Sequence, residues 1–240
     1  MVKVGRPPQD PARQLERAHR ILDAAAELIL RWGYDKITID DVAKRADVAK
    51  GTIYLHWKTR DDLFAALLRR ERVHLLGDMR AGGPATLSEV FGEFARVLLS
   101  RPLLRAVLIG DSDVLGKLTR QKRHSRTGLE LGGAFDAYIR RLIQHGAVRE
   151  EPGDHVTVIS SILYGFVSLQ HMMPDEARLP DYRIAELVAD TVERAMSTGR
   201  PLPGDDARAV AGATLDFLDS MEEIARQKLA ISLGSKERVT

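Results

Sequence analysis

Two helix-start signals lie close together in the first quarter of the chain, and their spacing restricts what the chain can fold into. The segments 38–41 and 59–62 each begin with threonine and end with aspartate three residues later. Such a threonine can accept a hydrogen bond from an amide of the first helical turn, and an acidic residue there interacts favourably with the helix dipole. Between the two signals only short helices fit, at about 38–46 and 49–55. We therefore predict two short helices joined by a tight turn, which is a helix-turn-helix.

Apolar residues recur at helical spacing along most of the remaining chain, and no segment shows the two-residue alternation of a strand. In the first helix, for example, Ile21, Leu22, Ala25 and Leu28 share one face. The fold class that we predict is all-α, with further helices over residues 14–32, from 59 onward, and over 86–100, 102–109, 112–119, 122–144, 154–172, 181–197 and 205–231.

The positive charge of the chain is concentrated at its N-terminal end. Residues 1–60 hold twelve lysines and arginines against eight aspartates and glutamates, whereas the rest of the chain has a net charge of −2. A basic module on a weakly acidic body is typical of a protein that contacts a polyanion, although a chance distribution of charge is the alternative. We expect a flexible arm at 1–12, a helix-turn-helix DNA-binding domain at 13–60, and a helical ligand-sensing and dimerisation domain at 61–240. In the arm, the basic segment 5–7 can enter an A·T-rich minor groove.

Composition and motifs exclude several kinds of chemistry. The chain has no cysteine, which rules out disulfides, thiolate metal sites and a cysteine nucleophile. It has no phosphate-binding loop, nucleophile elbow or zinc motif, and pairs such as Asp154 with His155 lack a recognisable metal-ligand or acid–base spacing. We therefore expect no enzyme activity, no catalytic residues, no metal and no cofactor. The N-terminus lacks a signal-peptide core and the apolar runs are too short to cross a bilayer, so we expect a cytoplasmic protein without membrane contact.

The second short helix carries polar groups where a DNA-recognition helix needs them. Val48, Ile53 and Trp57 are spaced to anchor this helix to a core. Thr38, at the start of the preceding helix, offers an amide and a hydroxyl to a phosphate. The candidate DNA contacts are Thr38, Ala49, Lys50, Gly51, Thr52, Tyr54, His56 and Lys58.

These residue types suit contacts with DNA. Lys50 can reach guanine O6/N7 or a phosphate, and Gly51 lets the backbone approach the bases closely. Tyr54 can donate to a phosphate while its ring packs on a thymine methyl, and His56 and Lys58 can contact phosphates where the chain leaves the groove. The alternative is that Tyr54 lies at the edge of a core and the lysines on a solvated face. Their co-occurrence in one short window between two capped helices favours DNA binding.

Residues 14–70 resemble the TetR family of bacterial transcriptional repressors. The resemblance rests on the segments TIDDVAKRA (38–46), VAKGTIYLHW (48–57) and KTRDDL (58–63). It implies an N-terminal three-helix DNA-binding domain followed by a helical sensor and dimerisation domain. It also implies a transcriptional regulator, by expectation a repressor, that binds a palindromic operator as a homodimer and is released by a small, mostly apolar ligand.

Three features depart from the pattern of this family. Asp47 stands in the turn where glycine is frequent, and aspartate tolerates a left-handed backbone better than most residues. Trp57 stands where phenylalanine is more usual, which enlarges the side chain in an apolar slot. Thr59 and Arg60 replace serine and lysine, which keeps both the helix cap and the charge. None of these changes conflicts with DNA binding.

A two-fold dimer would bring two recognition helices to successive major grooves about 34–36 Å apart. The candidate dimer helices are 154–172, which is apolar nearly all round, and 205–231, whose apolar residues recur with small residues between them. The alternative is that these residues only fill the core of their own chain.

A ligand pocket is expected among the helices between residues 86 and 172. A cavity that is apolar, with a few polar groups, suits a small lipophilic ligand. In the mechanism that the resemblance implies, the ligand moves helix 102–109 and then the helix that starts at 59, so that the DNA-binding domains separate. The alternatives are a ligand-independent DNA-binding activator or a nucleoid-type protein. The residues predicted by periodicity to face this pocket are Phe94, Leu98, Leu103, Val107, Leu118, Phe135, Ile139, Tyr164, Ser168 and His171, with His124 as a further candidate.

Overall fold

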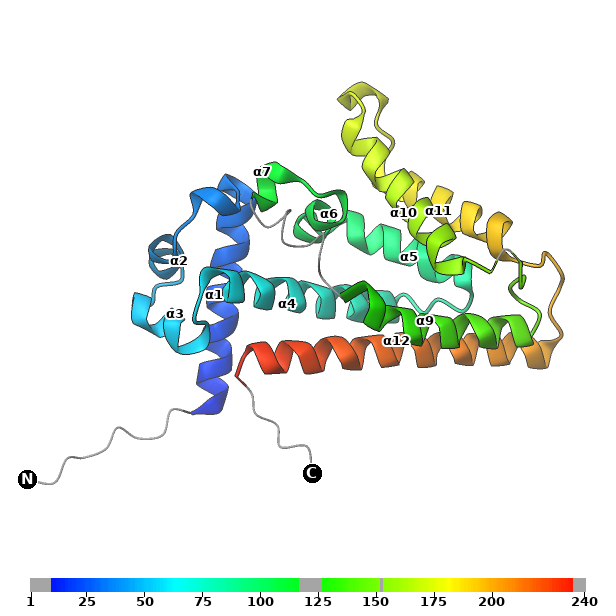
Figure 1. Ribbon diagram of the computed structural model, residues 1–240, viewed down its shortest axis with the longest axis horizontal. Helices are drawn as coiled ribbons and strands as arrows, with labels where there is room; N and C mark the ends of the chain where they lie inside the picture. Colours follow the sequence, from blue (N-terminus) through cyan, green and yellow to red (C-terminus); the bar gives the residue numbers. More distant parts are fainter. Residues whose placement is uncertain (1–9, 117–126, 152, 235–240) are drawn as a thin grey trace, which may run out of the picture.

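The computed structural model describes residues 10–116, 127–151 and 153–234, and in these ranges the chain consists of helices and loops (Figure 1). One isolated bridge joins Val148 to Ser197, and the described ranges contain no strand. The all-α fold predicted from the sequence is confirmed. The helices are α1 (Pro11–Trp32), α2 (Ile39–Arg45), α3 (Lys50–His56), α4 (Arg60–Ala81), α5 (Leu87–Leu99), α6 (Pro102–Ile109), α7 (Ser112–Leu115), α9 (Thr127–Gln144), α10 (His155–Met172), α11 (Asp181–Met196) and α12 (Gly204–Ser232), with short 3-10 turns η1 (Tyr34–Lys36) and η2 (Asp175–Ala177).

The predicted helix starts are present. Thr38 accepts a hydrogen bond from the amide of Asp41, and the Asp41 carboxylate accepts one from the amide of Thr38, which completes a capping box for α2. Thr59 and Asp62 make the same pair of bonds at the start of α4. Thr86 caps α5 through the amide of Glu89. These capping residues mark where the helices begin, because each accepts a hydrogen bond from an amide of the first turn that the helix itself leaves unpaired.

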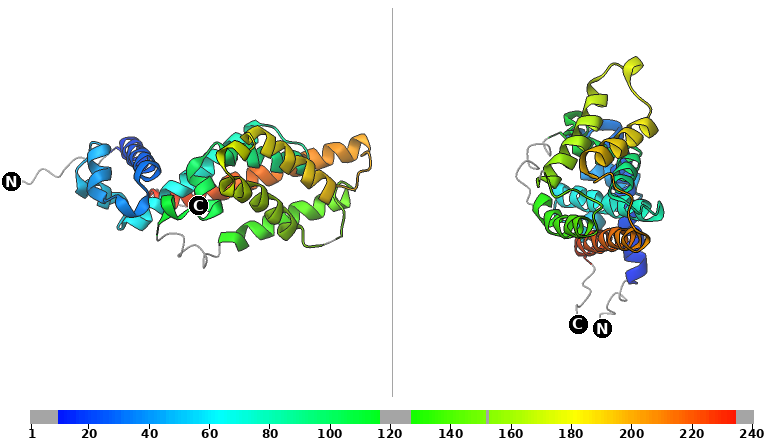
Figure 2. Two further views of the ribbon diagram at one scale, coloured as in Figure 1. Left: turned by 90° about the horizontal axis from the view of Figure 1, so that it is seen from above. Right: turned by 90° about the vertical axis from the view of Figure 1, so that its right-hand side faces the viewer.

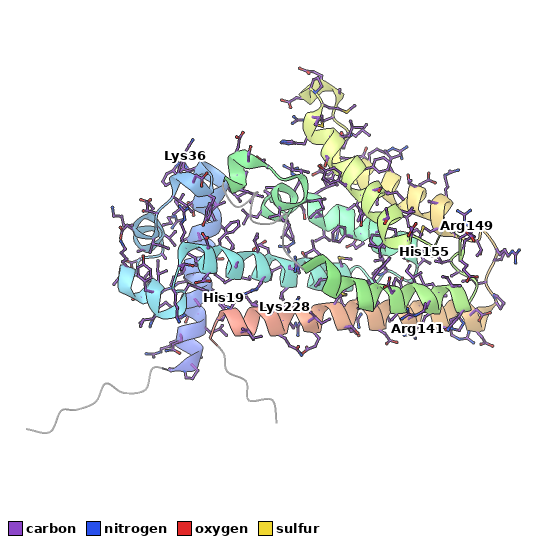
Figure 3. The ribbon with its side chains drawn as sticks, viewed as in Figure 1. His19, Lys36, Arg141, Arg149, His155 and Lys228 are labelled. Atoms are coloured by element: carbon purple, nitrogen blue, oxygen red, sulfur yellow. The ribbon has the colours of Figure 1, made fainter. Side chains whose placement is uncertain are left out.

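The molecule is elongated, with the helix-turn-helix at one end (Figure 2, left). α4 runs from that end into the helical body, and α12 packs against it along much of its length (Figure 1). α9 packs beside α12, and α5 packs against α11. Arg149 and His155 mark the end remote from the helix-turn-helix, whereas His19 of α1 and Lys228 of α12 lie near it (Figure 3).

The core of the N-terminal domain, which we define as α1–α3 with the first turns of α4, extends into two neighbouring helices. Leu103 and Ala106 of α6 and Leu115 of α7 are buried in the same cluster as Ile21, Ile53 and the other core residues of this domain. Two further clusters lie in the body. One is formed by α5, α9, α10, α11 and the first half of α12, and the other by α4, α5, α6 and the second half of α12, with one buried residue each from α10 and α11. The DNA-binding end and the body are therefore joined by shared apolar packing as well as by α4.

A buried arginine lies where α1 crosses α4. Arg70 is 4% exposed, and its guanidinium donates to Asp23 at 2.7 Å and to the carbonyl of His19 at 3.1 Å. Glu71 lies 3.6 Å from the same guanidinium and 3.2 Å from Arg101, which precedes α6. Charged groups therefore link α1, α4 and α6 at the boundary of the N-terminal domain.

Several sequence predictions fall outside the described ranges. They concern the basic segment 5–7, Leu118, His124, the end of the helix predicted at 112–119 and the start of the helix predicted at 122–144. Among the described helices, none combines the length and apolar character that a bilayer span requires.

Candidate nucleic-acid interface and ligand cavity

Residues 46–49 connect α2 to α3 and set the angle between them. Asp47 has a φ of 53°, in the left-handed region that was expected for this turn. The amide of Val48 donates to the carbonyl of Ala43 at 3.0 Å, which closes the turn on α2. The sequence from Ala43 to Ala49 thus builds the tight turn of a helix-turn-helix.

The inner side of α3 is held by the anchors predicted from the sequence. Ile53 is fully buried, Trp57 is 3% exposed, and Val48 is half-buried against the same core. The indole Nε1 of Trp57 donates to the backbone carbonyl of Ser232 at 3.0 Å. The additional volume of tryptophan at this position is therefore accommodated, and its polar group is paired.

The outer side of α3 presents two apolar side chains to solvent. Tyr54 is 47% exposed and Leu55 is 75% exposed. An apolar side chain on a recognition helix can pack against the methyl group of thymine. Leu55 was not predicted as a DNA contact, because the sequence marks it only as the last residue of a short helix. The signal for it was present, since Leu55 lies two residues from each of the anchors Ile53 and Trp57 and therefore faces away from them on a helix.

Two carboxylates of α2 hold two of the predicted DNA contacts. The amide and the hydroxyl of Thr38 both donate to Asp41, at 2.9 and 2.7 Å, and these bonds hold the pKa of Asp41 below its usual value. The Nζ atom of Lys50 lies 2.8 Å from Asp40, and this hydrogen-bonded pair raises the pKa of Lys50. A phosphate would have to compete with Asp40 and Asp41 for these donors.

The remaining predicted contacts surround this surface. Ala49, Gly51 and Lys58 are exposed, and Thr52 is half-buried. His56 is half-buried with its ring 5.2 Å from that of Trp57, and burial together with the charge of Arg17 holds its pKa below 6.5. The structure therefore brings all eight predicted residues to one end of the molecule, along α3, its flanking turns and the start of α2.

A cavity of about 350 Å³ lies in the helical body between α4, α5, α9, α10 and α12. Among the described residues that line it, Ser160 contributes the one hydroxyl, no side chain is charged, and the others are apolar. This volume is in the range of small-molecule sites in proteins. The lining residues are Leu76, Met79, Val90, Phe91, Phe94, Phe135, Val156, Ile159, Ser160, Leu163, Phe217, Leu218 and Met221.

The sequence placed only part of this lining. Phe94 and Phe135 line the cavity as expected. Leu98 and Ile139 are buried in the neighbouring core, away from the cavity wall. Leu103 is buried in the core shared with the N-terminal domain, and Val107 packs against that core. Both residues lie on the side of α6 that faces α1 and α7.

On α10 the predicted inward face is rotated. Tyr164 is 53% exposed, so the expectation that it faces the pocket is wrong; Ile159 and Leu163 lie on the buried side instead. Ser168 is half-buried and does not line the cavity, and His171 is exposed and borders a separate cavity of about 80 Å³. Apolar residues occur nearly all round this helix, so periodicity alone could not identify the side that packs inward.

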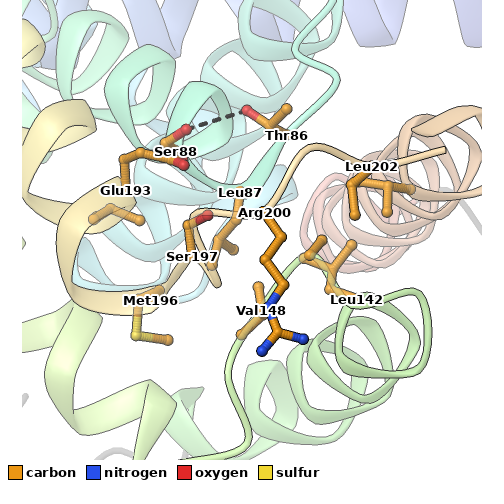
Figure 4. A pocket seen from close by; sticks show the side chains of 13 residues that line it. Thr86, Leu87, Ser88, Leu142, Val148, Glu193, Met196, Ser197, Arg200 and Leu202 are labelled. Atoms are coloured by element: carbon orange, nitrogen blue, oxygen red, sulfur yellow. Dashed lines mark hydrogen bonds between the residues drawn. The ribbon is translucent and has the colours of Figure 1, made fainter. Parts of the chain in front are cut away.

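A smaller cavity of about 140 Å³ lies at the end of the body remote from the N-terminal domain (Figure 4). Leu142, Val148 and Met196 form part of its apolar wall, and Glu193 and Arg200 lie on different sides of it. Elsewhere in the described ranges, no three histidine, aspartate or glutamate side chains converge as a metal site would require.

The two helices predicted to form a dimer interface differ in their exposed sides. The outer side of α10 carries apolar side chains, with Tyr164 53%, Leu169 52% and Met172 80% exposed. α12 packs against α4 and α9, where Asp219 pairs with Arg80 and Asp216 with Arg141. Its exposed residues are mostly polar or charged. The apolar side chains of α12 therefore pack mainly against other helices of the same chain.

Comparison with known proteins relates this architecture to one family. The family model described as "Bacterial regulatory proteins, tetR family" matches residues 21–67. The chain is 29% identical over 160 residues to the HTH-type transcriptional repressor KstR of Mycolicibacterium smegmatis, covering 62% of this chain and 74% of that protein. It is 26% identical over 192 residues to KstR of Mycobacterium tuberculosis, covering 74% of this chain and 83% of that protein.

Solved structures share the fold. A putative TetR-family transcriptional regulator from Mesorhizobium loti superposes with a TM-score of 0.55 at 16% identity, covering 78% of this chain and 99% of the other. SmeT of Stenotrophomonas maltophilia in complex with triclosan gives a TM-score of 0.50 at 19% identity, covering 79% and 96%. At these identities the likeness extends to the fold of both the N-terminal domain and the helical body.

Proposed function

Because this chain belongs to the TetR family of bacterial transcriptional regulators, we propose that it represses transcription as a homodimer on a palindromic operator. In this proposal an uncharged, mostly hydrocarbon ligand enters the 350 Å³ cavity and releases the DNA. The observation that carries the proposal is the outer face of α3. It presents Lys50, Tyr54 and Leu55 on a short helix whose opposite side is anchored by buried Ile53 and Trp57.

Homodimer formation is supported by the exposed apolar side of α10 and by the geometry of palindromic DNA. Two identical recognition helices related by two-fold symmetry match two half-sites of an operator. The exposed side chains of Tyr164, Leu169 and Met172 give a second copy of the chain an apolar surface to cover. We assign the dimer contact to α10 rather than to α12.

The ligand class follows from the lining of the cavity. An ionised group would lose its hydration there without meeting an opposite charge from the lining that the structure describes, because none of those residues is charged. An apolar cavity of about 150 Å³ accepts benzene, so this cavity suits a ligand of about 14 non-hydrogen atoms. Ser160 can exchange one hydrogen bond with a hydroxyl or carbonyl of such a ligand. The relative SmeT is described in complex with triclosan, which supports ligand binding in this fold.

Selection of operator sequences from random DNA with the purified protein tests the DNA-binding proposal. We expect a short palindrome, and Tyr54→Ala should weaken operator binding by roughly 1–3 kcal/mol. Lys58→Ala should lower the slope of log affinity against log salt by about one phosphate contact per subunit. Tyr182→Ala is a matched control, because Tyr182 is 65% exposed on α11, far from α3. Coverage of DNA without a preferred sequence would point to a nucleoid-type protein instead.

Release of a fluorescent operator by 1-decanol and by decanoate tests the ligand class. The two compounds have the same chain length and differ in charge, so we expect 1-decanol to release DNA at concentrations at least about tenfold lower. Leu163→Trp should remove this response by filling the cavity, at a folding cost of about 1–3 kcal/mol that circular dichroism can monitor. Equal potency of the two compounds, or full response of the filled variant, would contradict the assignment.

A further inference from the structure

The last helix reaches from the cavity to the recognition helix. α12 spans Gly204–Ser232, lies along α4, and ends beside the N-terminal domain (Figures 1 and 3). Phe217, Leu218 and Met221 in its middle line the 350 Å³ cavity. From Met221 to Ser232 the helix is continuous over roughly 16 Å. A displacement of α12 at the cavity is therefore transmitted to its C-terminal end.

That end is attached to α3 and α4 through specific contacts. The backbone carbonyl of Ser232 accepts the hydrogen bond from Trp57 Nε1 at 3.0 Å, and Trp57 is the residue that caps the C-terminus of α3. The Ser232 hydroxyl accepts a hydrogen bond from Arg69 of α4. Leu233 packs against the core of the N-terminal domain. We call these four residues, Trp57, Arg69, Ser232 and Leu233, the α12 clamp.

The clamp adds an attachment between α3 and the helical body. Within the N-terminal domain, α3 is held by the turn from α2, by its buried anchor Ile53, and by Thr59, which follows within three residues and caps α4. The hydrogen bond to Ser232 comes from outside this domain and acts at the C-terminal end of α3, where it restricts the angle of α3 relative to the body. Trp57 is 3% exposed, so its N–H is shielded from water while Ser232 is in place.

We propose that the α12 clamp positions the recognition helix for its operator and makes α12 a second route, beside α4, from the cavity to the DNA. Trp57 and Ser232 act as positioning residues in this scheme. A ligand that displaces Met221 and its neighbours shifts Ser232 relative to Trp57, so α3 loses its fixed angle. The coupling to a ligand rests on the proposed function above; the positioning of α3 does not.

The hydrogen bond can be removed from either side. Trp57→Phe keeps an aromatic ring in the slot and removes the donor, and a chain ending at Ala230 removes the acceptor together with Leu233. A chain ending at Gly234 keeps the clamp and controls for loss of the last residues. Trp32→Phe is a matched control, because Trp32 is 44% exposed at the end of α1.

Affinity for the selected operator and for scrambled DNA is measured for each variant at one salt concentration. We expect Trp57→Phe and the chain ending at Ala230 each to weaken operator binding by roughly three- to tenfold, with no change on scrambled DNA. Because both remove the same bond, the combined variant should lose no more than the chain ending at Ala230. The chain ending at Gly234 and Trp32→Phe should behave as wild type.

Several outcomes overturn the proposal. These are unchanged operator affinity in both variants, additive losses in the combined variant, or equal losses on operator and scrambled DNA. If Trp57→Phe does not fold by circular dichroism, the chains ending at Ala230 and Gly234 decide the question alone.

A measurement with 1-decanol distinguishes failure of this proposal from failure of the proposed function. If 1-decanol releases wild-type DNA, the shift in operator affinity should fall at least about threefold in Trp57→Phe. An unchanged shift rejects the second route and leaves the ligand assignment intact. If 1-decanol has no effect on the wild type, the ligand assignment fails, while the DNA measurements still decide whether the clamp positions α3.

Discussion

Gly51 lies on the outer side of α3, where an added Cβ would meet no heavy atom of the chain within 4 Å. Nothing inside the protein requires glycine at this position, and alanine would favour the helix by up to about 1 kcal/mol. We predict that the bare backbone of Gly51 approaches the DNA closely, so that a side chain here would collide with the operator. Gly51→Ala should raise the free energy of unfolding in urea and weaken operator binding by roughly tenfold, or about 1.4 kcal/mol. Unchanged operator affinity would show that the backbone does not approach the bases here.

Asp40 restrains one of the cations that we assign to DNA. Its carboxylate lies 2.8 Å from Lys50 Nζ, and both side chains are about half exposed. Asp40→Asn removes a negative charge next to the DNA and frees Lys50, so we expect tighter binding, by severalfold at low salt. Asp190→Asn, which disrupts a similarly exposed pair with Arg194 on α11, is the control. Fluorescence anisotropy with labelled operator checks the result, and weaker binding of Asp40→Asn would mean that Asp40 orders Lys50 for the contact.

His56 should make operator binding depend on pH. Burial, with the nearby charge of Arg17, holds its pKa below 6.5, so the ring is mainly neutral near pH 7 in the free protein. A phosphate beside the ring favours the protonated form, so binding takes up a proton and operator affinity rises as pH falls from about 8 to about 6. His56→Gln should flatten this dependence, whereas His74→Gln on α4 should not. An equal pH dependence in His56→Gln and wild type would remove His56 from the interface.

The lowered pKa of His56 also makes folding stability depend on pH, in the direction opposite to operator affinity. The unfolded chain binds a proton at His56 more readily than the native protein does. The contribution of this residue to stability is therefore present above about pH 6.5 and is lost as the pH falls below that value. Measurements of operator affinity must be made where the protein remains folded.

Single residues were predictable from the sequence where a local rule decides their role. Thr38, Asp47 and Trp57 were each placed by chain-local requirements, namely a helix cap, a left-handed turn and an apolar anchor. The pairing of Lys50 with Asp40 was not predicted, because the two residues lie on different helices and their separation depends on the turn geometry. A contact between side chains of two helices depends on the angle between those helices. The residue pattern of one helix does not contain that angle.

At the scale of elements, Arg70 connects α1 to α4. Its side chain is 5% exposed and contacts Asp23, whose side chain is 69% exposed, so the ion pair is screened on one side. Arg70→Ala should lower the free energy of unfolding by about 3 kcal/mol, because it opens a cavity and leaves the carbonyl of His19 without this donor. Arg70→Met keeps most of the volume and should cost clearly less. Urea unfolding followed by circular dichroism measures both; equal losses would show that charge, not packing, dominates this joint.

The helices were predictable as elements, but the faces that meet were only partly so. α10 is apolar nearly all round, and the structure turns Ile159 and Leu163 inward while Tyr164 faces solvent. α12 was expected to offer its apolar residues to a partner chain, yet Leu218, Met221 and Ala225 pack within its own chain. Which side of a helix packs inward depends on the helices that lie next to it. Periodicity within one helix does not identify those neighbours.

At the scale of the whole molecule, the arrangement of α10 and α12 predicts which helix forms the dimer. Met172 of α10 is 80% exposed and Ile231 of α12 is 76% exposed, so a glutamate at either site should be tolerated by the folded monomer. A buried charge at a two-fold interface appears twice and loses its hydration in both copies. Met172→Glu should therefore shift the protein from dimer to monomer in sedimentation velocity experiments, and Ile231→Glu should leave it dimeric.

The two variants also separate dimer formation from DNA contact. A monomer offers one recognition helix, so Met172→Glu should lose most of its preference for the full palindrome over a single half-site, although α10 lies far from α3 (Figure 1). The measurement is the ratio of affinities for the two DNAs at one salt concentration. If Ile231→Glu dissociates the protein and Met172→Glu does not, the interface is formed through α12, and the charged outer side of that helix must then be matched by complementary charges from a second copy.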